Sequence, residues 1–166
     1  LSSNATKKLV LVSGRSYPAL AKDIASHLGI EVLKTTLYDF ADGEIYCRYT
    51  QSVRGDDVFV FQTHCQPINK WIMEQLIMID ALKRASVRSI TAVIPFLGYS
   101  RQDKKHLGRE PISCKLVMDL LTAAGVNRVM SVDLHSAQIQ GFFNGPVDHL
   151  QAMPTLVSYI KESMKG

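Results

Sequence analysis

The chain has 166 residues, and its composition, 46% hydrophobic and 20% charged, excludes an intrinsically disordered protein. Its formal charge of +4 slightly favours anionic partners but does not demand nucleic acid. Three cysteines without C-x-x-C spacing exclude a disulfide framework and a zinc cluster, and they favour a reducing, cytoplasmic location.

The length predicts one domain over residues 1–166, because domains typically hold roughly 100–200 residues. Residues 1–8 lack the order of a signal peptide, and no apolar stretch reaches the ~20 residues of a membrane helix. We therefore expect a soluble protein with no membrane partner. The absent initiator Met and the end at Gly166 suggest a trimmed or partial chain.

The first half of the chain alternates apolar runs with one amphipathic segment. Strands are predicted at Lys8–Ser13 and Ile30–Leu33, on either side of a helix over Tyr17–Leu28. Glu44–Tyr49 alternates like one arm of a hairpin, and Val58–Phe61 is a fully apolar strand. This half therefore predicts a strand, a helix, a hairpin and a further strand.

The second half repeats the strand and helix cycle. A helix follows Pro67 and runs through Lys83, and strands are predicted at Ile90–Ile94 and Arg128–Val132. Between those strands lies a helix over Ile112–Ala124, and Pro154 opens a last helix to about Lys161. The order predicts an α/β fold, a mostly parallel sheet flanked by helices on both faces.

A basic loop after the strand Ile90–Ile94 is the first candidate site. Arg101, Lys104, Lys105 and Arg109 surround a single acid, Asp103. An isolated cluster of this kind is more often a solvated loop. Here it follows the carboxyl end of a strand, where open α/β sheets bind ligands, and arginine offers a planar fork of donors to phosphate. We therefore expect an anionic ligand such as ATP.

A carboxylate and an imidazole follow the next strand, and they form the second candidate. Asp133 and His135 stand at alternate positions and could project to the same side. A histidine after a strand is often only a hydrogen-bonded structural residue. Mg²⁺ nevertheless needs only one or two protein ligands beside substrate phosphates, so this pair is sufficient for a magnesium site.

The third candidate is the segment Phe40–Ile45, which contains Asp-Gly. Asp-Gly is a common hairpin signal, and the residues alone favour an ordinary turn. The functional alternative is that Phe40 stacks on a base while Asp42 or Glu44 accepts hydrogen bonds.

Two common nucleotide motifs are missing from the sequence. It has neither the phosphate loop G-x-x-x-x-G-K-S/T nor the fingerprint G-x-G-x-x-G, which argues against a P-loop nucleotidase and a dinucleotide oxidoreductase. A nucleic-acid-binding module is also disfavoured, because no recognised binding motif is present.

Taken together, these motifs resemble the amino-terminal half of the ribose-phosphate pyrophosphokinase (phosphoribosyl pyrophosphate synthetase) family. The resemblance covers nearly the whole chain and runs through seven segments in order: Phe40–Ile45, Ser52–Gly55, Leu76–Leu82, Ile90–Pro95, Arg101–Lys105, Arg109–Ser113 and Val132–Leu150. It implies a phosphoribosyltransferase-like domain with a projecting hairpin, normally followed by a second domain of similar fold that this chain lacks.

The resemblance implies a reaction and roles for particular residues. The family transfers the diphosphate of ATP to the C1 hydroxyl of ribose 5-phosphate, requires Mg²⁺ and needs no covalent catalytic residue. The implied ATP contacts within the chain are Arg101, Gln102, Lys104 and Lys105. Phe40, Asp42, Gly43 and Glu44 would serve the ATP site of a neighbouring subunit, and the implied metal ligands are His135 and Asp133. The implied regulatory positions are Arg54 and Arg109.

The resemblance also sets what we expect of partners and of the isolated chain. ATP is the expected ligand of this half, ribose 5-phosphate would bind through the missing domain, and the family forms homo-oligomers, commonly hexamers. We expect the isolated chain to be inactive. The alternative is a non-catalytic regulatory subunit that associates with a synthetase. Whether Asn144, where many relatives carry Asp, or Asp148 helps to bind metal is left open by the sequence.

Overall fold

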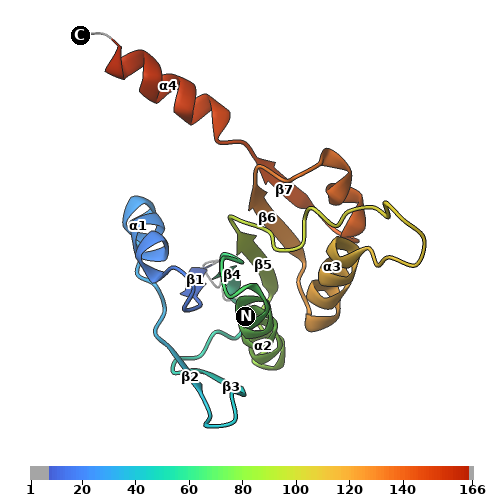
Figure 1. Cartoon of the computed structure of the whole chain (residues 1–166). Coiled ribbons are helices and arrows are strands. Elements are labelled where there is room, and N and C mark those ends of the chain that lie inside the picture. Colours follow the sequence, from blue (N-terminus) through green and yellow to red (C-terminus); the bar gives the residue numbers. More distant parts are fainter. Residues whose placement is uncertain (1–7, 165–166) are drawn as a thin grey trace, which may run out of the picture.

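A computed structural model describes residues 8–164 of the chain (Figure 1). The predicted domain over 1–166 therefore includes a few residues outside the described range, and most of the segment examined for a signal peptide lies there as well. No helix within the described residues is long and apolar enough to cross a membrane.

A five-stranded parallel sheet forms the centre of the fold. Its strands, in spatial order, are β1 (Leu9–Ser13), β4 (Asp57–Phe61), β5 (Ser89–Ile94), β6 (Arg128–Val132) and β7 (Val147–Leu150). Every neighbouring pair in this order is parallel, which confirms the predicted sheet type. Since parallel strands end at the same edge, the loops that follow β5 and β6 leave the sheet side by side.

Helices cover both faces of the sheet, as predicted. The helices are α1 (Pro18–Leu28), α2 (Ile68–Arg84), α3 (Ser113–Ala124) and α4 (Met153–Ser163), with a short 3₁₀ turn η1 (Ala137–Phe142). Figure 1 shows α1 apart from α2 and α3, with the sheet between them. On the α1 face, Ala21 and Ala25 pack on Leu11 and Phe61.

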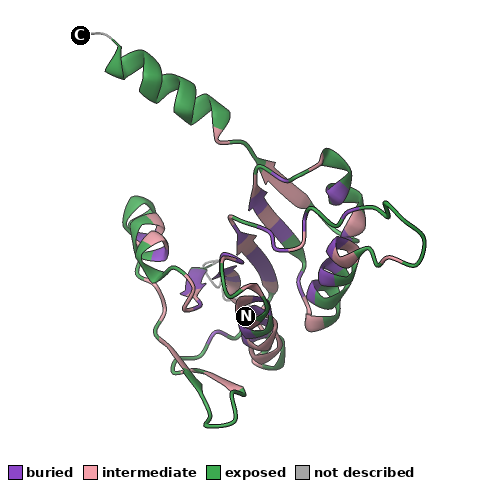
Figure 2. Cartoon of the chain, viewed as in Figure 1, coloured by how far each residue is buried: buried purple, intermediate pink, exposed green. Residues whose placement is uncertain are grey.

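The larger core lies on the other face, beneath α2 and α3. Met78 and Leu82 of α2 and Met118 of α3 are fully buried there against β4, β5 and β6. Figure 2 shows this burial in the strands and the inner sides of both helices, whereas α4 is exposed along its length. The packing leaves the carboxyl edge of the sheet free for loops.

A two-stranded antiparallel sheet, β2 (Thr35–Asp39) and β3 (Ile45–Tyr49), projects from the body as the expected hairpin (Figure 1). The strand predicted at Ile30–Leu33 was wrong. That segment runs along the outer edge of β1 but makes only one bridge, between Leu11 and Val32. Its side chains Ile30 and Val32 pack against the small core that includes Leu11 of β1. Continuous strand pairing begins only at Thr35, which pairs with Tyr49 of β3.

Two elements had no clear sequence signal. β7 has only four residues, half-buried at the sheet edge, and pairs with β6 from Val129 opposite Val147. The turn η1 buries Ile139 alone. Both are too short for hydrophobic periodicity to identify.

Candidate functional site

The loops after β5 and β6 share one cavity at the carboxyl edge of the sheet. Its volume is about 150 Å³, and its lining residues are Phe96, Leu97, Ser100, Arg101, Ser131, Val132, Asp133, Leu134 and His135. Arg101 comes from the first loop, whereas Asp133 and His135 come from the second. The structure therefore brings the predicted cationic and metal-ligating side chains to one place.

Asp103 holds these two loops together. Its Oδ2 accepts hydrogen bonds from Ser136 Oγ at 2.6 Å and from Gln138 Nε2 at 3.0 Å. The bond from Ser136, opposed by burial and assisted by Gln138, holds the pKa of Asp103 below its usual range. In the sequence, Asp103 stands out only as the lone acid in a basic run. That isolation was the one available signal of a structural role.

A buried histidine anchors the start of the first loop. The Gly98 N–H donates to His64 Nδ1 at 3.1 Å, and His64 Nε2 donates to Gln75 Oε1 at 2.8 Å. A Cβ at Gly98 would lie 3.0 Å from Ile68 and 3.1 Å from His64, so any larger residue would have to push these side chains aside. The next residue, Tyr99, adopts the left-handed backbone conformation, with φ of 63°.

Arg101 and Gln102 also line a second, open pocket of about 670 Å³ beside the start of α2. The other lining residues are Gln66, Pro67, Ile68, Asn69, Phe96, Tyr99 and Ser100. Gln102 has a structural task as well, because its Oε1 accepts from Ser113 Oγ at 2.6 Å and its carbonyl accepts from the Cys114 N–H at 3.1 Å. Gln102 therefore ties this pocket to the start of α3.

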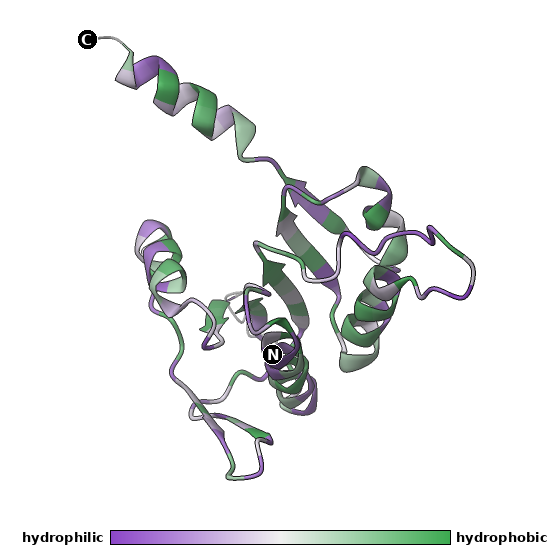
Figure 3. Ribbon diagram, viewed as in Figure 1, coloured by the Kyte–Doolittle hydropathy of each residue, from purple (hydrophilic) through white to green (hydrophobic). Residues whose placement is uncertain are grey.

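The remaining basic residues of the loop are exposed. Lys104, Lys105 and Arg109 line neither of these two cavities and lie on the hydrophilic segment between β5 and α3, drawn largely purple in Figure 3. Glu110 closes that segment, since its Oε2 accepts from the N–H groups of His106 and Leu107. These bonds, from Leu107 first, lower the pKa of Glu110.

Asp133 and His135 differ from expectation in their backbone. β6 ends at Val132, and Asp133 has φ of 46°, so strand alternation does not explain why both residues line the same cavity. Asp133 Oδ1 accepts from the Ala152 N–H at 3.3 Å, which leaves Oδ2 available. Residues 8–164 contain no group of three or more His, Cys, Asp or Glu side chains placed to hold a metal. A carboxylate oxygen and an imidazole fit Mg²⁺ only if substrate phosphates and water complete the set.

Asn144 and Asp148 lie outside the residues that line the Arg101 and His135 cavity. Asp148 pairs with Arg128 across β6 and β7, with 2.8 Å between Arg128 Nη1 and Asp148 Oδ1. Asn144 is exposed, and neither residue lines the cavity that Arg101 and His135 share.

The residues of the hairpin tip line neither of the two cavities around Arg101. Phe40 is 46% exposed and packs edge-on against Tyr38 and Tyr46. Gly43 has φ of 93° and donates its N–H to the Phe40 carbonyl, which confirms the predicted turn. None of Phe40, Asp42, Gly43 and Glu44 lines the pockets around Arg101.

The two implied regulatory arginines do not meet within one chain. Arg54 precedes β4 at the amino-terminal end of the sheet, whereas Arg109 follows β5 at the carboxyl end. A site that used both would have to form between copies of the chain.

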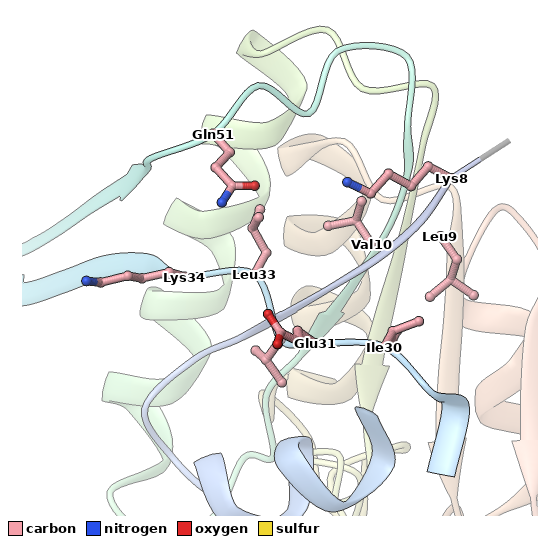
Figure 4. A pocket seen from close by; sticks show the side chains of 9 residues that line it. Lys8, Leu9, Val10, Ile30, Glu31, Leu33, Lys34 and Gln51 are labelled. Atoms are coloured by element: carbon pink, nitrogen blue, oxygen red, sulfur yellow. The ribbon is translucent and has the colours of Figure 1, made fainter. Parts of the chain in front are cut away.

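Another open pocket, of about 730 Å³, lies beside the start of β1 (Figure 4). Its polar side chains are Lys8, Glu31, Lys34 and Gln51. It contains none of the residues that the sequence singled out, and it lies at the end of β1 away from the β5 and β6 loops.

Comparison with known proteins gives one consistent result. Residues 9–125 match the family model for the N-terminal domain of ribose phosphate pyrophosphokinase. The ribose-phosphate pyrophosphokinase of Bifidobacterium longum is 70% identical over 166 residues, covering 100% of this chain and 49% of that protein. That of Streptomyces coelicolor is 59% identical over 160 residues, covering 96% and 49% respectively.

A solved structure is similar over the same range. The crystal structure of phosphoribosylpyrophosphate synthetase from Mycobacterium smegmatis superposes with a TM-score of 0.92 at 58% identity. The match covers 94% of this chain and 52% of that one. The chain therefore spans about half the length of the curated relatives that it matches.

Proposed function

The chain belongs to the ribose-phosphate pyrophosphokinase family, as its N-terminal domain, and we propose that it supplies the ATP- and Mg²⁺-binding half of a ribose-phosphate diphosphokinase. The complete enzyme would transfer the diphosphate of ATP to the C1 hydroxyl of ribose 5-phosphate, giving phosphoribosyl pyrophosphate and AMP. The half of the relatives that lies beyond this match would bind ribose 5-phosphate.

The cavity shared by Arg101, Asp133 and His135 is the main support for this proposal. Phosphoryl transfer depends mostly on positioning and on neutralising charge, so it needs no nucleophilic side chain from the protein. Arg101 would bind phosphate oxygens through its planar guanidinium, and Gln102 would bind beside it from the adjoining pocket. Lys104 and Lys105 would contribute charge from the exposed loop.

The second loop would hold the metal. His135 and the free Oδ2 of Asp133 are the donors that would bind Mg²⁺ together with the phosphates of ATP. Mg²⁺ there would neutralise the charge that develops on the transferred diphosphate. Asp103 would keep the two loops at a constant separation through Ser136 and Gln138.

The hairpin would act on another copy of the chain. Phe40 is exposed at the tip, and neither Phe40 nor Asp42, Gly43 and Glu44 lines the pockets of their own chain's Arg101. Phe40 would stack on the adenine of ATP bound to a neighbour, and Arg54 and Arg109 would meet at an effector site between copies. The protein would form a homo-oligomer, a hexamer. It would reside in the cytoplasm, where its three free cysteines stay reduced.

The test compares Arg101→Met with Arg84→Met in the complete gene product that contains this chain. Arg84 lies on α2 and pairs only with the exposed Asp80, so it is a matched control. Loss of a charge-assisted phosphate contact should lower kcat/KM for ATP by about 10- to 100-fold, and the control should stay within about twofold.

The same assay separates the competing functions. The 166-residue chain alone should release no AMP from ATP and ribose 5-phosphate. If the complete gene product alone also releases no AMP, the enzyme proposal is refuted. The function as a regulatory subunit that associates with a synthetase would then be favoured.

A further inference from the structure

A line of four charged side chains connects the buried body of the molecule to the hairpin. It begins at Glu74, which is 0% exposed on α2, and continues through Arg15 and Asp39 to Lys70. The two carboxylates and two cations alternate in sign, so the line is neutral overall. Asp39 is the last residue of β2, immediately before Phe40.

The inner end of this line is rigid. Glu74 Oε1 accepts from the Arg15 backbone N–H at 2.7 Å, and Oε2 accepts from Arg15 Nε at 2.6 Å. A third bond comes from Gln62 Nε2 at 2.9 Å. A buried carboxylate is tolerated only when its oxygens are fully paired, and here both oxygens are paired by groups that are themselves held in place.

Gln62 fixes the turn that contains Arg15. Its Oε1 accepts from Ser16 Oγ at 2.7 Å and from the Ser16 N–H at 3.2 Å. Its amide also fills the space above Gly14, where any Cβ would collide with it. The backbone at Arg15 is therefore held in place, and the bond from Arg15 Nε to Glu74 orients the guanidinium.

The outer end of the line reaches the hairpin. Arg15 Nη2 donates to Asp39 Oδ1, and Lys70 Nζ donates to Asp39 Oδ2 at 2.6 Å. Both carboxylate oxygens of Asp39 are thus held, one from the β1 turn and one from α2. The bonds from Lys70 and then Arg15 lower the pKa of Asp39, so it remains charged at neutral pH.

We propose that Arg15 is a positioning residue that sets the direction of the hairpin tip by joining Asp39 to the buried Glu74. A two-stranded hairpin has little core of its own. Leu37, Cys47 and Tyr49 pack the base of this one on the main core, so the link through Arg15 would act on the direction of the tip beyond that base. The role rests on the proposed function, because it concerns how Phe40, Asp42 and Glu44 are presented to ATP on a neighbouring copy. Arg15 itself would touch neither ATP nor metal.

Arginine is required for this role because one guanidinium serves two carboxylates at once. Nε reaches Glu74 while Nη2 reaches Asp39. A lysine has a single ammonium group, so Arg15→Lys should keep the charge beside Glu74 and lose the link to Asp39. Asp39→Asn should loosen the same link from the other side.

The first measurement is hydrogen exchange on the 166-residue chain. Backbone amides of β2 and β3, including the Phe40 N–H that donates to the Glu44 carbonyl, should exchange about tenfold faster in both variants. Amides of α2, β4 and β5 should keep their rates, which shows that the fold is intact. The matched control is Arg84→Lys, at an exposed ion pair elsewhere on α2.

The second measurement is steady-state kinetics of the complete gene product. Both variants should raise KM for ATP severalfold and leave KM for ribose 5-phosphate unchanged, whereas a general loss of structure would change both. Unchanged exchange in the hairpin of both variants would overturn the positioning role, whatever the kinetics show. Faster exchange with an unchanged KM for ATP would support the positioning role and overturn the placement of the hairpin at an ATP site.

Discussion

Replacing His64 by asparagine should remove much of the sensitivity of this fold to mild acid. His64 is 0% exposed, and burial, opposed only by its bond to Gln75, lowers its pKa from 6.5 to about 4. Its Nδ1 accepts from the Gly98 N–H and its Nε2 donates to Gln75, so the neutral ring is the form that the structure holds.

The sign and size of the effect follow from this shift. The unfolded chain takes up the proton near its ordinary pKa, whereas the folded chain resists protonation until about pH 4. The stabilisation is complete above the unfolded value and is lost as the pH falls through it toward the folded value. Linkage predicts a loss of about 2 kcal/mol between about pH 7 and about pH 5, with about 1 kcal/mol more below that.

The assay is urea unfolding of the wild-type chain and His64→Asn at both pH values. Asn Oδ1 can still accept from the Gly98 N–H, but Gln75 Oε1 loses its donor, which should cost about 1–3 kcal/mol near pH 7. The variant should then lose about 2 kcal/mol less than the wild type on acidification. Other titrating groups are common to both proteins and cancel in this comparison.

A surface histidine provides the control. His27 is exposed on α1, so His27→Asn removes an imidazole without disturbing the core or the Gly98 loop. If wild type and His64→Asn lose equal stability between the two pH values, then His64 is not held neutral, and the account of how it anchors the Gly98 loop is wrong.

Three further outcomes test the loops and the core. Asp103→Asn should speed hydrogen exchange in residues 133–142 and lower Tm. In the wild type, the stability contributed by the Asp103 carboxylate should be lost as the pH falls below the ordinary carboxyl range, because the pKa of Asp103 is lowered. Gly98→Ala should cost about 1–3 kcal/mol in urea unfolding because of Ile68 and His64, whereas Gly108→Ala, with nothing within 4 Å of its Cβ, should cost under about 0.5 kcal/mol. Burial raises the pKa of Cys47 and of Cys114 to about 11, so a thiol reagent near neutral pH should label both at least about a hundredfold more slowly than in the unfolded chain. Rapid labelling of Cys114 would show that α3 opens readily.

Much of the secondary structure was readable from local signals. Asp42-Gly43 marked the hairpin turn, and the predicted ends of α1 at Leu28 and of α3 at Ala124 are confirmed. The prediction of a strand at Ile30–Leu33 was wrong, because an extended apolar segment becomes a strand only if the adjacent sheet edge pairs with it. That edge is β1, which offers it a single bridge.

The location of the candidate site was also predictable, but its construction was not. Loops after successive parallel strands meet at one edge, so Arg101 and His135 could be expected near each other. Nothing in the sequence indicated that Ser136 would bind Asp103, 33 residues away, or that Gly98 would depend on His64, 34 residues away.

The amino-acid sequence by itself determined the alternation of strands and helices, the hairpin turn and the sheet edge at which charged loops gather. These features depend on backbone preferences and on the periodicity of neighbouring side chains, which act over a few residues. Only the tertiary structure decided the strand order and the pairing of Arg15 with Glu74, 59 residues away. It also decided that the hairpin tip lines neither pocket of its own chain's Arg101. Such contacts form between segments that folding brings together, and their strength comes from burial, which no local pattern specifies.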